Sequence, residues 1–151
     1  MMDLKLYKRP LAALTVTGDK VRVTPGMLAK FGNALSTVNV NVYCVSVGEY
    51  SVSFYVDEAE HETARDALHK VVDHSAFGAL SLLRGIGMVT VTGPELVDSP
   101  GMMVGMIEPI SKAGINLLSV SSSFDSVVIF VGWNDARKAY ELVEKKFLKG
   151  L

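Results

Sequence analysis

VDSPGMMVG, residues 97–105, has the same pattern as RVTPGMLAK, residues 22–30, at a distance of 75 residues. Each segment places a hydroxyl residue before Pro-Gly-Met and continues into a run that is typical of a helix. Further out, the same offset aligns TVTG at 15–18 with TVTG at 90–93, and no gap is needed from residue 15 to residue 72. The sequence therefore predicts two copies of one unit, each about 75 residues long.

Both copies show the same succession of hydrophobic periodicities, which predicts the same order of elements. In copy one these are a strand at 12–16, a helix with the stripe Leu28, Phe31, Leu35 and Val38, strands at 40–47 and 52–56, and a helix opened by Glu58 and Glu60. Copy two repeats them, with Met103, Met106, Ile110 and Ala113 along its first helix and its second strand at 115–122. The predicted order in each copy is β-α-β-β-α.

A fourth strand would complete a ferredoxin-like βαββαβ unit with its helices on one face of an antiparallel sheet. Residues 79–83 supply a candidate after copy one, whereas copy two ends without one. The run Leu4 to Lys8 holds the equivalent place before copy one. We therefore expect an α+β fold of two such units, at 10–84 and 85–151, with the strand at 3–9 completing the second.

Composition limits the classes of function. The 151 residues are 49% hydrophobic, which indicates a buried subunit interface and hence a homodimer or higher homo-oligomer. A net charge of -1 gives no reason to expect nucleic acid or a membrane surface as partner. No apolar run approaches the ~20 residues of a membrane span. The N-terminus has no apolar signal core, so a cytoplasmic location is expected. The single Cys44 excludes an internal disulfide.

The repeated corner has the chemistry of an anion site. Proline suits the first helical position and Ser or Thr the cap before it, so the N–H groups of Gly101 and Met102 are expected to point out of the helix. Such a helix start binds carboxylates and phosphates, although the same residues also make a good helix start with no ligand. Asn41 and Asn116 begin the second strands, where they are either turn formers or ligand contacts. A helix start and an Asn from an adjacent unit would together hold an α-amino acid.

Residues 86–131 resemble the second ACT domain in the regulatory region of aspartokinases, through the strand ending in Gly93, the Ser-Pro-Gly helix start, Gly114-Ile115-Asn116 and the serine-rich strand. Residues 11–56 resemble the first unit of that pair, through TPGM and Val40-Asn41-Val42. The resemblance implies units paired side by side and a free amino acid bound at their interface. It also implies allosteric feedback regulation in the biosynthesis of aspartate-family amino acids.

The resemblance also implies which residues contact the ligand: Asp98, Ser99, Pro100, Gly101, Met102, Asn116 and Leu117 in copy two, and Thr24, Pro25, Gly26, Asn41 and Val42 in copy one. Asp98 aligns with Val23, so the two sites are not expected to be equivalent. Lysine-sensitive relatives carry an acidic residue where this chain has Tyr43 and Leu118. Threonine or another small amino acid is therefore favoured over lysine.

Catalytic alternatives find little support. Lys30-Phe31-Gly32-Asn33 is similar to the KFGG start of an aspartokinase catalytic domain, but Phe31 belongs to a helical stripe. His61 and His69 lie two turns apart, too far for a simple metal pair. We therefore expect no catalytic residue, metal or cofactor. The expected function is an amino-acid sensor, either a fragment of an aspartokinase or a regulatory subunit whose partner is the catalytic domain. The alternative is an oligomerisation module with degenerate ligand sites.

Overall fold

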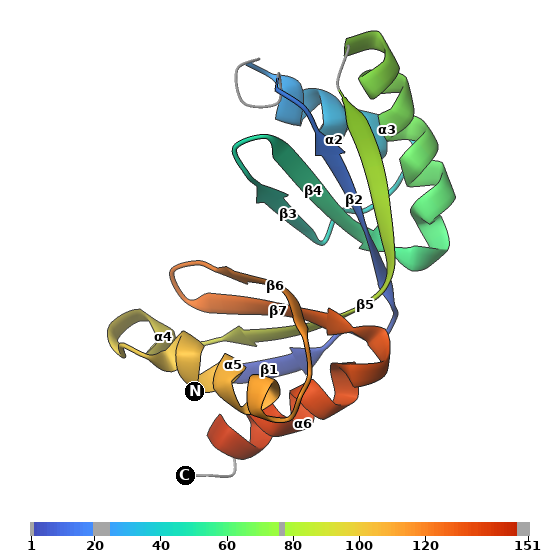
Figure 1. Ribbon diagram of the computed structural model, residues 1–151. Helices are drawn as coiled ribbons and strands as arrows, with labels where there is room; N and C mark the ends of the chain where they lie inside the picture. The colour runs from blue at the N-terminus through green and yellow to red at the C-terminus, as the bar shows by residue number, and fades with distance from the viewer. Residues whose placement is uncertain (1, 20–24, 76–77, 148–151) are drawn as a thin grey trace. The chain divides into compact units, whose positions relative to one another are not determined.

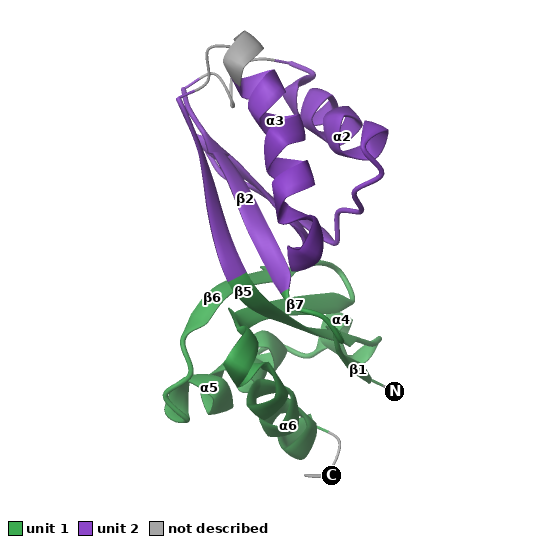
Figure 2. Ribbon diagram, turned by 90° about the vertical axis from the view of Figure 1, so that its right-hand side faces the viewer, with its two compact units in different colours: residues 1–10, 85–151 green, residues 11–84 purple. Residues whose placement is uncertain are grey.

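The computed structural model describes residues 2–19, 25–75 and 78–147 (Figure 1). The chain divides into two compact units, numbered as in Figure 2: unit 2 comprises residues 11–84, and unit 1 comprises residues 1–10 together with 85–151. The N-terminal segment thus belongs to the same unit as the C-terminal half of the chain.

Unit 2 holds copy one of the repeat. Its elements are β2 (Leu11–Thr17), α2 (Met27–Thr37), β3 (Cys44–Val47), β4 (Ser51–Asp57), the 3₁₀ turn η1 (Glu58–Glu60), α3 (His61–Ser75) and the first part of β5 (Ala79–Thr92). The strands lie in the order β3-β4-β2-β5. Antiparallel pairing of β2 with β4 runs from Leu11 opposite Asp57 to Thr17 opposite Ser51. Side chains of α2 and α3 share one core with β2 and β4, so both helices cover the same face of the sheet (Figure 1).

Unit 1 holds copy two and is closed by the N-terminal strand. Its elements are the rest of β5, α4 (Glu95–Asp98), α5 (Met102–Lys112), β6 (Leu117–Ser122), β7 (Ser126–Gly132), the 3₁₀ turn η2 (Trp133–Asp135), α6 (Ala136–Phe147) and β1 (Asp3–Leu6). β1 pairs antiparallel with β5, with Leu4 opposite Val91, and the strand order is β1-β5-β7-β6. The predicted fold class, two ferredoxin-like units with antiparallel sheets, is confirmed.

Each unit has its own apolar core, built from alternate residues of the strands and from one stripe of each helix. In unit 2 the rings of Phe31 and Phe54 meet edge to face, with centroids 5.9 Å apart, between α2 and β4. In unit 1, Met106 and Ile110 of α5 are fully buried against the sheet. Leu4 and Leu6 of β1 pack on the same core, so the N-terminal segment contributes side chains to unit 1.

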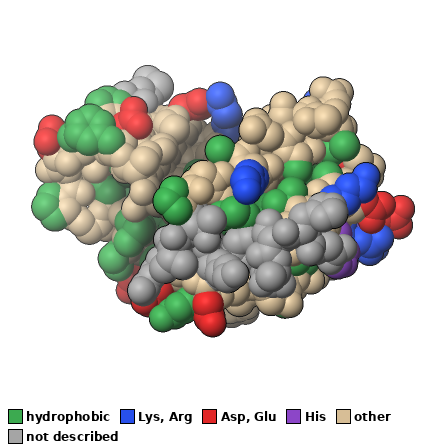
Figure 3. Space-filling model, turned by 90° about the horizontal axis from the view of Figure 1, so that it is seen from above, with side chains coloured by type: hydrophobic (Ala, Val, Ile, Leu, Met, Phe, Trp, Pro, Cys, Tyr) green, Lys and Arg blue, Asp and Glu red, His purple; other side chains and the backbone are tan. Residues whose placement is uncertain are grey.

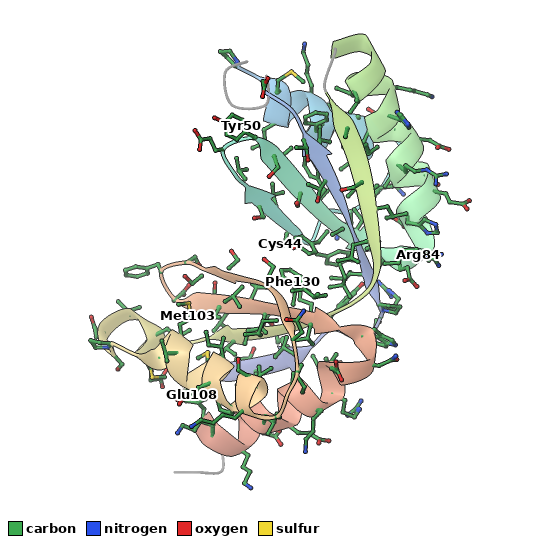
Figure 4. All side chains as sticks on the ribbon, in the orientation of Figure 1. Cys44, Tyr50, Arg84, Met103, Glu108 and Phe130 are labelled. Carbon is green, nitrogen blue, oxygen red and sulfur yellow. The ribbon has the colours of Figure 1, made fainter. Side chains whose placement is uncertain are left out.

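The predicted first-helix stripes are partly wrong. Leu28 is 51% exposed and Val38 39%, and the buried positions of α2 are Met27, Phe31 and Leu35. Met103 of α5, labelled in Figure 4, is 40% exposed, and Ala113, the C-cap residue of this helix, is exposed as well. The buried residues of both helices are four apart: Met27, Phe31 and Leu35 in α2, and Met106 and Ile110 in α5. The second strands also begin later than predicted, at Cys44 and Leu117.

Charged side chains of both signs lie on the face shown in Figure 3, where Lys or Arg and Asp or Glu side chains adjoin one another at one edge. In the part of the chain that the structure describes, no helix is both long and apolar enough to cross a membrane.

Candidate functional site

The two Pro-Gly-Met corners have almost identical backbone geometry. Gly26 has φ 81° and ψ 1°, Gly101 has φ 84° and ψ 0°, and each is the N-cap of its helix. The first intrahelical hydrogen bonds run from Lys30 N to Gly26 O at 3.0 Å and from Gly105 N to Gly101 O at 2.9 Å. The N–H groups of residues 27–29 and 102–104 therefore have no acceptor inside their helices.

This geometry corrects the predicted helix start. Pro25 and Pro100 do not occupy the first helical position, and neither N-cap residue caps its helix with a side-chain hydrogen bond. The φ and ψ of both glycines are those of the third residue of a type II turn, with proline at the second position. An added Cβ would meet nothing within 4 Å at either glycine, so the left-handed backbone, rather than space, favours glycine here.

Neither corner contains an acidic residue in the first helical turn, so the positive end of the helix dipole is not offset from within its own helix. Pro25, Gly26, Ser99, Pro100 and Gly101 are all exposed, whereas Met27 is buried and Met102 half-buried. Thr24, a predicted contact of copy one, lies outside the described residues, as does Val23. Both corners are thus exposed turns followed by backbone N–H groups that have no acceptor inside the helix, and such groups suit a carboxylate.

Copy two adds a short helix before its corner that the sequence reading missed. Helix α4 follows Gly93 and ends at Asp98, which is exposed next to Ser99. The signal was Pro94 followed by Glu95, because proline and an acidic residue both favour a helix start. Asp98 is therefore held on a helical turn directly before the type II turn, and it is the one acidic side chain among the predicted contacts.

Asn41 and Asn116 follow equivalent helix ends. The chain leaves α2 through Asn39 at φ 61° and leaves α5 through Gly114 at φ 78°. Both exits are Schellman motifs: Val40 N donates to Leu35 O at 3.0 Å, and Ile115 N donates to Ile110 O at 3.2 Å. The residue after each motif is the exposed asparagine. Val42 and Leu117 come next, and both are half-buried against their cores.

The two halves of the predicted site lie at opposite ends of each unit. Asn41 follows the C-terminal end of α2, while Gly26 precedes its N-terminal end, and 11 helical residues at 1.5 Å each separate them by roughly 16 Å. Helix α5 has the same length, so Gly101 and Asn116 are separated equally. A single unit therefore cannot bring its own helix start and its own asparagine onto one small ligand.

The strand start of copy one borders a surface hollow. Its volume is about 470 Å³, and Gly32, Ser36, Asn39, Val40, Asn41 and Val42 line it. The lining is made of hydroxyl, amide and apolar groups without a titratable side chain. The structure thus brings Asn41 and Val42, two predicted contacts, to one concave surface.

A carboxylate that the sequence did not predict lies beside Tyr43. Tyr43 donates its hydroxyl to the Asp57 carboxylate at 2.9 Å. Asp57 ends β4 and is 14 residues further along the chain, so only the pairing of the strands reveals it. Copy two has Leu118 and Gly132 at these positions and cannot form the pair.

The surroundings of the other potentially reactive side chains favour structural roles over catalysis or metal binding. Cys44 is half-buried at the start of β3, and burial raises the pKa of its thiol, which disfavours the nucleophilic thiolate. The Nδ1 atom of His61 lies 2.7 Å from the Glu58 carbonyl oxygen, and the His61 side chain is only 16% exposed. Among the described residues, no group of three or more His, Cys, Asp or Glu side chains could hold a metal ion.

Each of the two units matches the model of a known protein family. Residues 14–72 match the ACT domain, and residues 82–145 match it a second time. The chain belongs to the ACT-domain family. Its two units are ACT units in tandem, as the resemblance of the sequence implied.

The similar proteins are aspartokinases. The bifunctional aspartokinase/homoserine dehydrogenase 1 of Arabidopsis thaliana is 23% identical over 145 residues, which cover 91% of this chain and 16% of that protein. The ligand-free regulatory subunit of aspartate kinase from Thermus thermophilus superimposes with a TM-score of 0.79 at 21% identity, over 95% of this chain and 96% of that one. Aspartokinase III of E. coli, in complex with lysine and aspartate, gives 0.74 at 22% identity, over 95% of this chain and 32% of that one.

The family matches establish two ACT units in tandem, and the solved structures show the shared fold. The chain spans about 16% of the length of the plant relatives that it matches. The alignment with the Thermus thermophilus regulatory subunit, by contrast, covers 96% of that chain.

Proposed function

We propose that this chain is the amino-acid-sensing regulatory part of an aspartokinase, without catalysis of its own. The observation that carries the proposal is the pair of glycine-capped helix starts, Gly26 and Gly101, whose following N–H groups have no acceptor inside the helix. Each presents donors and a positive dipole end suited to the α-carboxylate of a free amino acid. The aspartokinase relatives supply the biological setting, feedback control of aspartate-family biosynthesis.

The proposed site is shared between units. A helix start holds the carboxylate, and the strand start of a neighbouring unit, at Asn41-Val42 or Asn116-Leu117, contacts the ammonium end. This division follows from the separation of the two halves within each unit. The proposed site requires a second ACT unit, either within the chain or from another copy. In the second case the chain forms a homodimer or higher homo-oligomer.

The ligand that fits this account is threonine or another small amino acid. The corners and strand starts are made of backbone groups, hydroxyls and amides, with Asp98 as the acidic member of the predicted contacts. The carboxylate of Asp57 already accepts a hydrogen bond from Tyr43. A long cationic side chain such as that of lysine therefore finds no dedicated partner among the predicted contacts of copy one.

Regulation would act through a population shift. A ligand that bridges two units favours the arrangement in which both halves of the site meet, and it changes the equilibrium only by its difference in affinity for the two states. Typical couplings of this kind are about 1–3 kcal/mol. The output would be the activity of an aspartokinase catalytic domain, carried on the same chain or on a partner.

Isothermal titration calorimetry with each of the twenty protein amino acids tests the proposal. Binding of at least one of them below millimolar concentration, with threonine ahead of lysine, is the expected result. Absence of binding by all twenty would remove the sensor function.

A second function, an oligomerisation module with degenerate ligand sites, is favoured by one observation. Large apolar side chains of unit 1 remain exposed, including Val104 of α5 at 54% and Phe124 between β6 and β7 at 78%. Gel filtration with and without amino acids separates the two functions. A sensor changes its elution or its concentration dependence when the ligand is added, whereas a module with degenerate sites elutes identically in both conditions.

A further inference from the structure

The methionines of this chain differ in how far they are exposed. Six of the seven lie among the described residues, and of these Met103, the second residue of α5, is the most exposed, at 40%. The other five are buried or half-buried: Met2, Met27, Met88, Met102 and Met106. The thioether that a dissolved reagent reaches most easily in the described part of the chain is therefore that of Met103.

An exposed thioether is reactive toward hydroperoxides. Oxidation to the sulfoxide turns a flexible apolar side chain into a polar one, and methionine sulfoxide reductases reverse the change. The competing sulfur atom, that of Cys44, is half-buried, and burial raises the pKa of its thiol, so little of the reactive thiolate is present at neutral pH. Among the described sulfur-containing side chains, Met103 is thus the favoured target of a peroxide.

The position of Met103 in its helix connects this chemistry to the corner of copy two. Long side chains in a helix point back toward its N-terminus, so a residue covers the surface of the preceding turn. For Met103 the preceding segment is the exposed turn of Ser99, Pro100 and Gly101. The N–H groups of residues 102–104 follow this turn and have no acceptor inside the helix. The sulfur atom therefore belongs to the same corner as a set of backbone donors.

Copy one has the same corner without the oxidisable side chain. The repeat offset of 75 places Leu28 at the position of Met103, and Leu28 is 51% exposed. Gly26 and Gly101, the N-caps of the two helices, have φ 81° and 84°. A leucine side chain has no sulfur atom for a peroxide to oxidise. The chain thus holds a matched pair of corners, one with a thioether and one without.

We propose that Met103 is an oxidation site, and that its sulfoxide oxygen accepts a hydrogen bond from the helix-start N–H groups of copy two. A sulfur lone pair attacks one oxygen of hydrogen peroxide, the S–O bond forms and the O–O bond breaks. Sulfur loses two electrons and the peroxide gains them. The departing hydroxide takes the proton that the attacked oxygen loses, and it leaves as water. The sulfoxide oxygen carries a partial negative charge, which suits the positive end of the helix.

Oxidation then competes with a ligand at one corner only. This consequence rests on the proposed function, since it assumes that the helix start of copy two binds an α-carboxylate. An acceptor on the same helix occupies a donor and repels the carboxylate, so binding at this corner weakens by about two- to fivefold. The corner of copy one keeps its affinity, because Leu28 is not oxidised.

Hydrogen peroxide added to the isotopically labelled full chain tests the oxidation site without a ligand. Peptide mass spectrometry should find the added oxygen on Met103 earlier than on the five other described methionines. Amide hydrogen exchange followed by NMR should slow at one or more of residues 102–104 and stay unchanged at residues 27–29. Methionine sulfoxide reductase should restore the original exchange rates.

Two variants exchange the side chains of the matched corners. Met103→Leu should abolish both the oxidation at this position and the slowed exchange. Leu28→Met should bring oxidation to position 28 and slow exchange at residues 27–29, because the two corners have the same backbone geometry. Both positions are exposed, so both variants are expected to fold, and circular dichroism melts verify this.

The competition with ligand is measured on the same chain before and after oxidation. The amino acid of highest affinity is titrated while the amide shifts of both corners are followed. After oxidation, half-maximal shifts at residues 102–104 should require about two- to fivefold more of this amino acid, and those at residues 27–29 should be unaltered.

Earlier oxidation of another described methionine would overturn the oxidation site, and so would a sulfoxide at Met103 that leaves the exchange of residues 102–104 unchanged. Equal weakening at both corners, or no effect of oxidation at residues 102–104, would overturn the competition while the sensor function survives. If the unoxidised chain binds none of the twenty amino acids, the proposed function and the competition both fail. Mass spectrometry and ligand-free exchange then still decide whether Met103 is the oxidation site.

Discussion

Gly26 and Gly101 hold the same left-handed backbone conformation 75 residues apart, with φ 81° and 84°. Each has the φ and ψ of the third residue of a type II turn and is the N-cap of a helix. The repetition of the local geometry, and not only of the letters Pro-Gly-Met, indicates that both copies are built to present the first N–H groups of a helix at a turn.

Replacement of either glycine by alanine should destabilise its unit by about 1–2 kcal/mol, because an L residue is strained at positive φ. Chemical denaturation followed by circular dichroism measures the change. Gly32→Ala is the matched control: its Cβ also meets nothing within 4 Å, but no positive φ occurs there, so helix propensity should stabilise α2 by roughly 0.5–1 kcal/mol. Equal effects at positions 26 and 32 would contradict this reading of the corner.

Gly87→Ala should destabilise unit 1 for a different reason. The added Cβ would lie 2.3 Å from the Cβ of Ala136, which is itself 1% exposed, so the start of α6 must move away from β5. Overpacking of this kind costs about 1–3 kcal/mol. The double variant Gly87→Ala/Ala136→Gly should recover part of the loss in a double-mutant cycle, and strictly additive effects would show that the two positions do not contact each other.

Removal of residues 2–9 should damage unit 1 selectively. β1 covers the edge of β5 with the pairs Asp3–Thr92 to Leu6–Val89, and its two leucines belong to the core of unit 1. The truncated chain exposes a strand edge and should aggregate. Hydrogen exchange resolved by peptide should show lost protection in residues 86–132 and retained protection in residues 11–57. Uniform loss across both units would argue against two separate cores.

The Glu108–Lys112 pair gives a prediction for pH. The hydrogen bond from Lys112 lowers the pKa of Glu108, so the pair stabilises the fold above the unfolded pKa of about 4.3 and ceases to do so as pH falls through the lowered folded value. Glu108→Gln should therefore be slightly less stable than the unaltered chain at pH 7, and the two should converge near pH 3. Thermal melts at both pH values measure this. A constant difference would mean that charge is not the cause.

The fold could be read from the sequence because the repeat is gapless and its strands alternate cleanly. Val16 and Val91, for example, are both buried on the helix side of their sheets. The position of the N-terminal strand followed from counting strands, since copy two lacked a fourth one. The predicted ligand contacts could not be read from periodicity in this way. They follow from the motifs shared with the family, and their roles remain proposals.

The details that were missed depend on backbone conformation or tertiary contact. Pro25-Gly26 reads equally well as a helix start or as a type II turn, and only the positive φ of Gly26 decides. The second strand of copy one begins at Cys44, later than predicted. The Schellman motif at the end of α2, with Asn39 at φ 61°, reverses the direction of the chain before the strand begins. The hollow beside Asn41 depends on the absence of a side chain at Gly32, which hydrophobic periodicity does not register.

The most direct measurement for the central claim is the change in amide chemical shifts when each of the twenty amino acids is titrated into isotopically labelled chain. For the amino acid that binds, the largest shifts should fall on the N–H groups of residues 27–29 or 102–104 and on the side-chain amide of Asn41 or Asn116. Binding that leaves these groups unchanged and perturbs another surface would contradict the account, as would no response to any of the twenty.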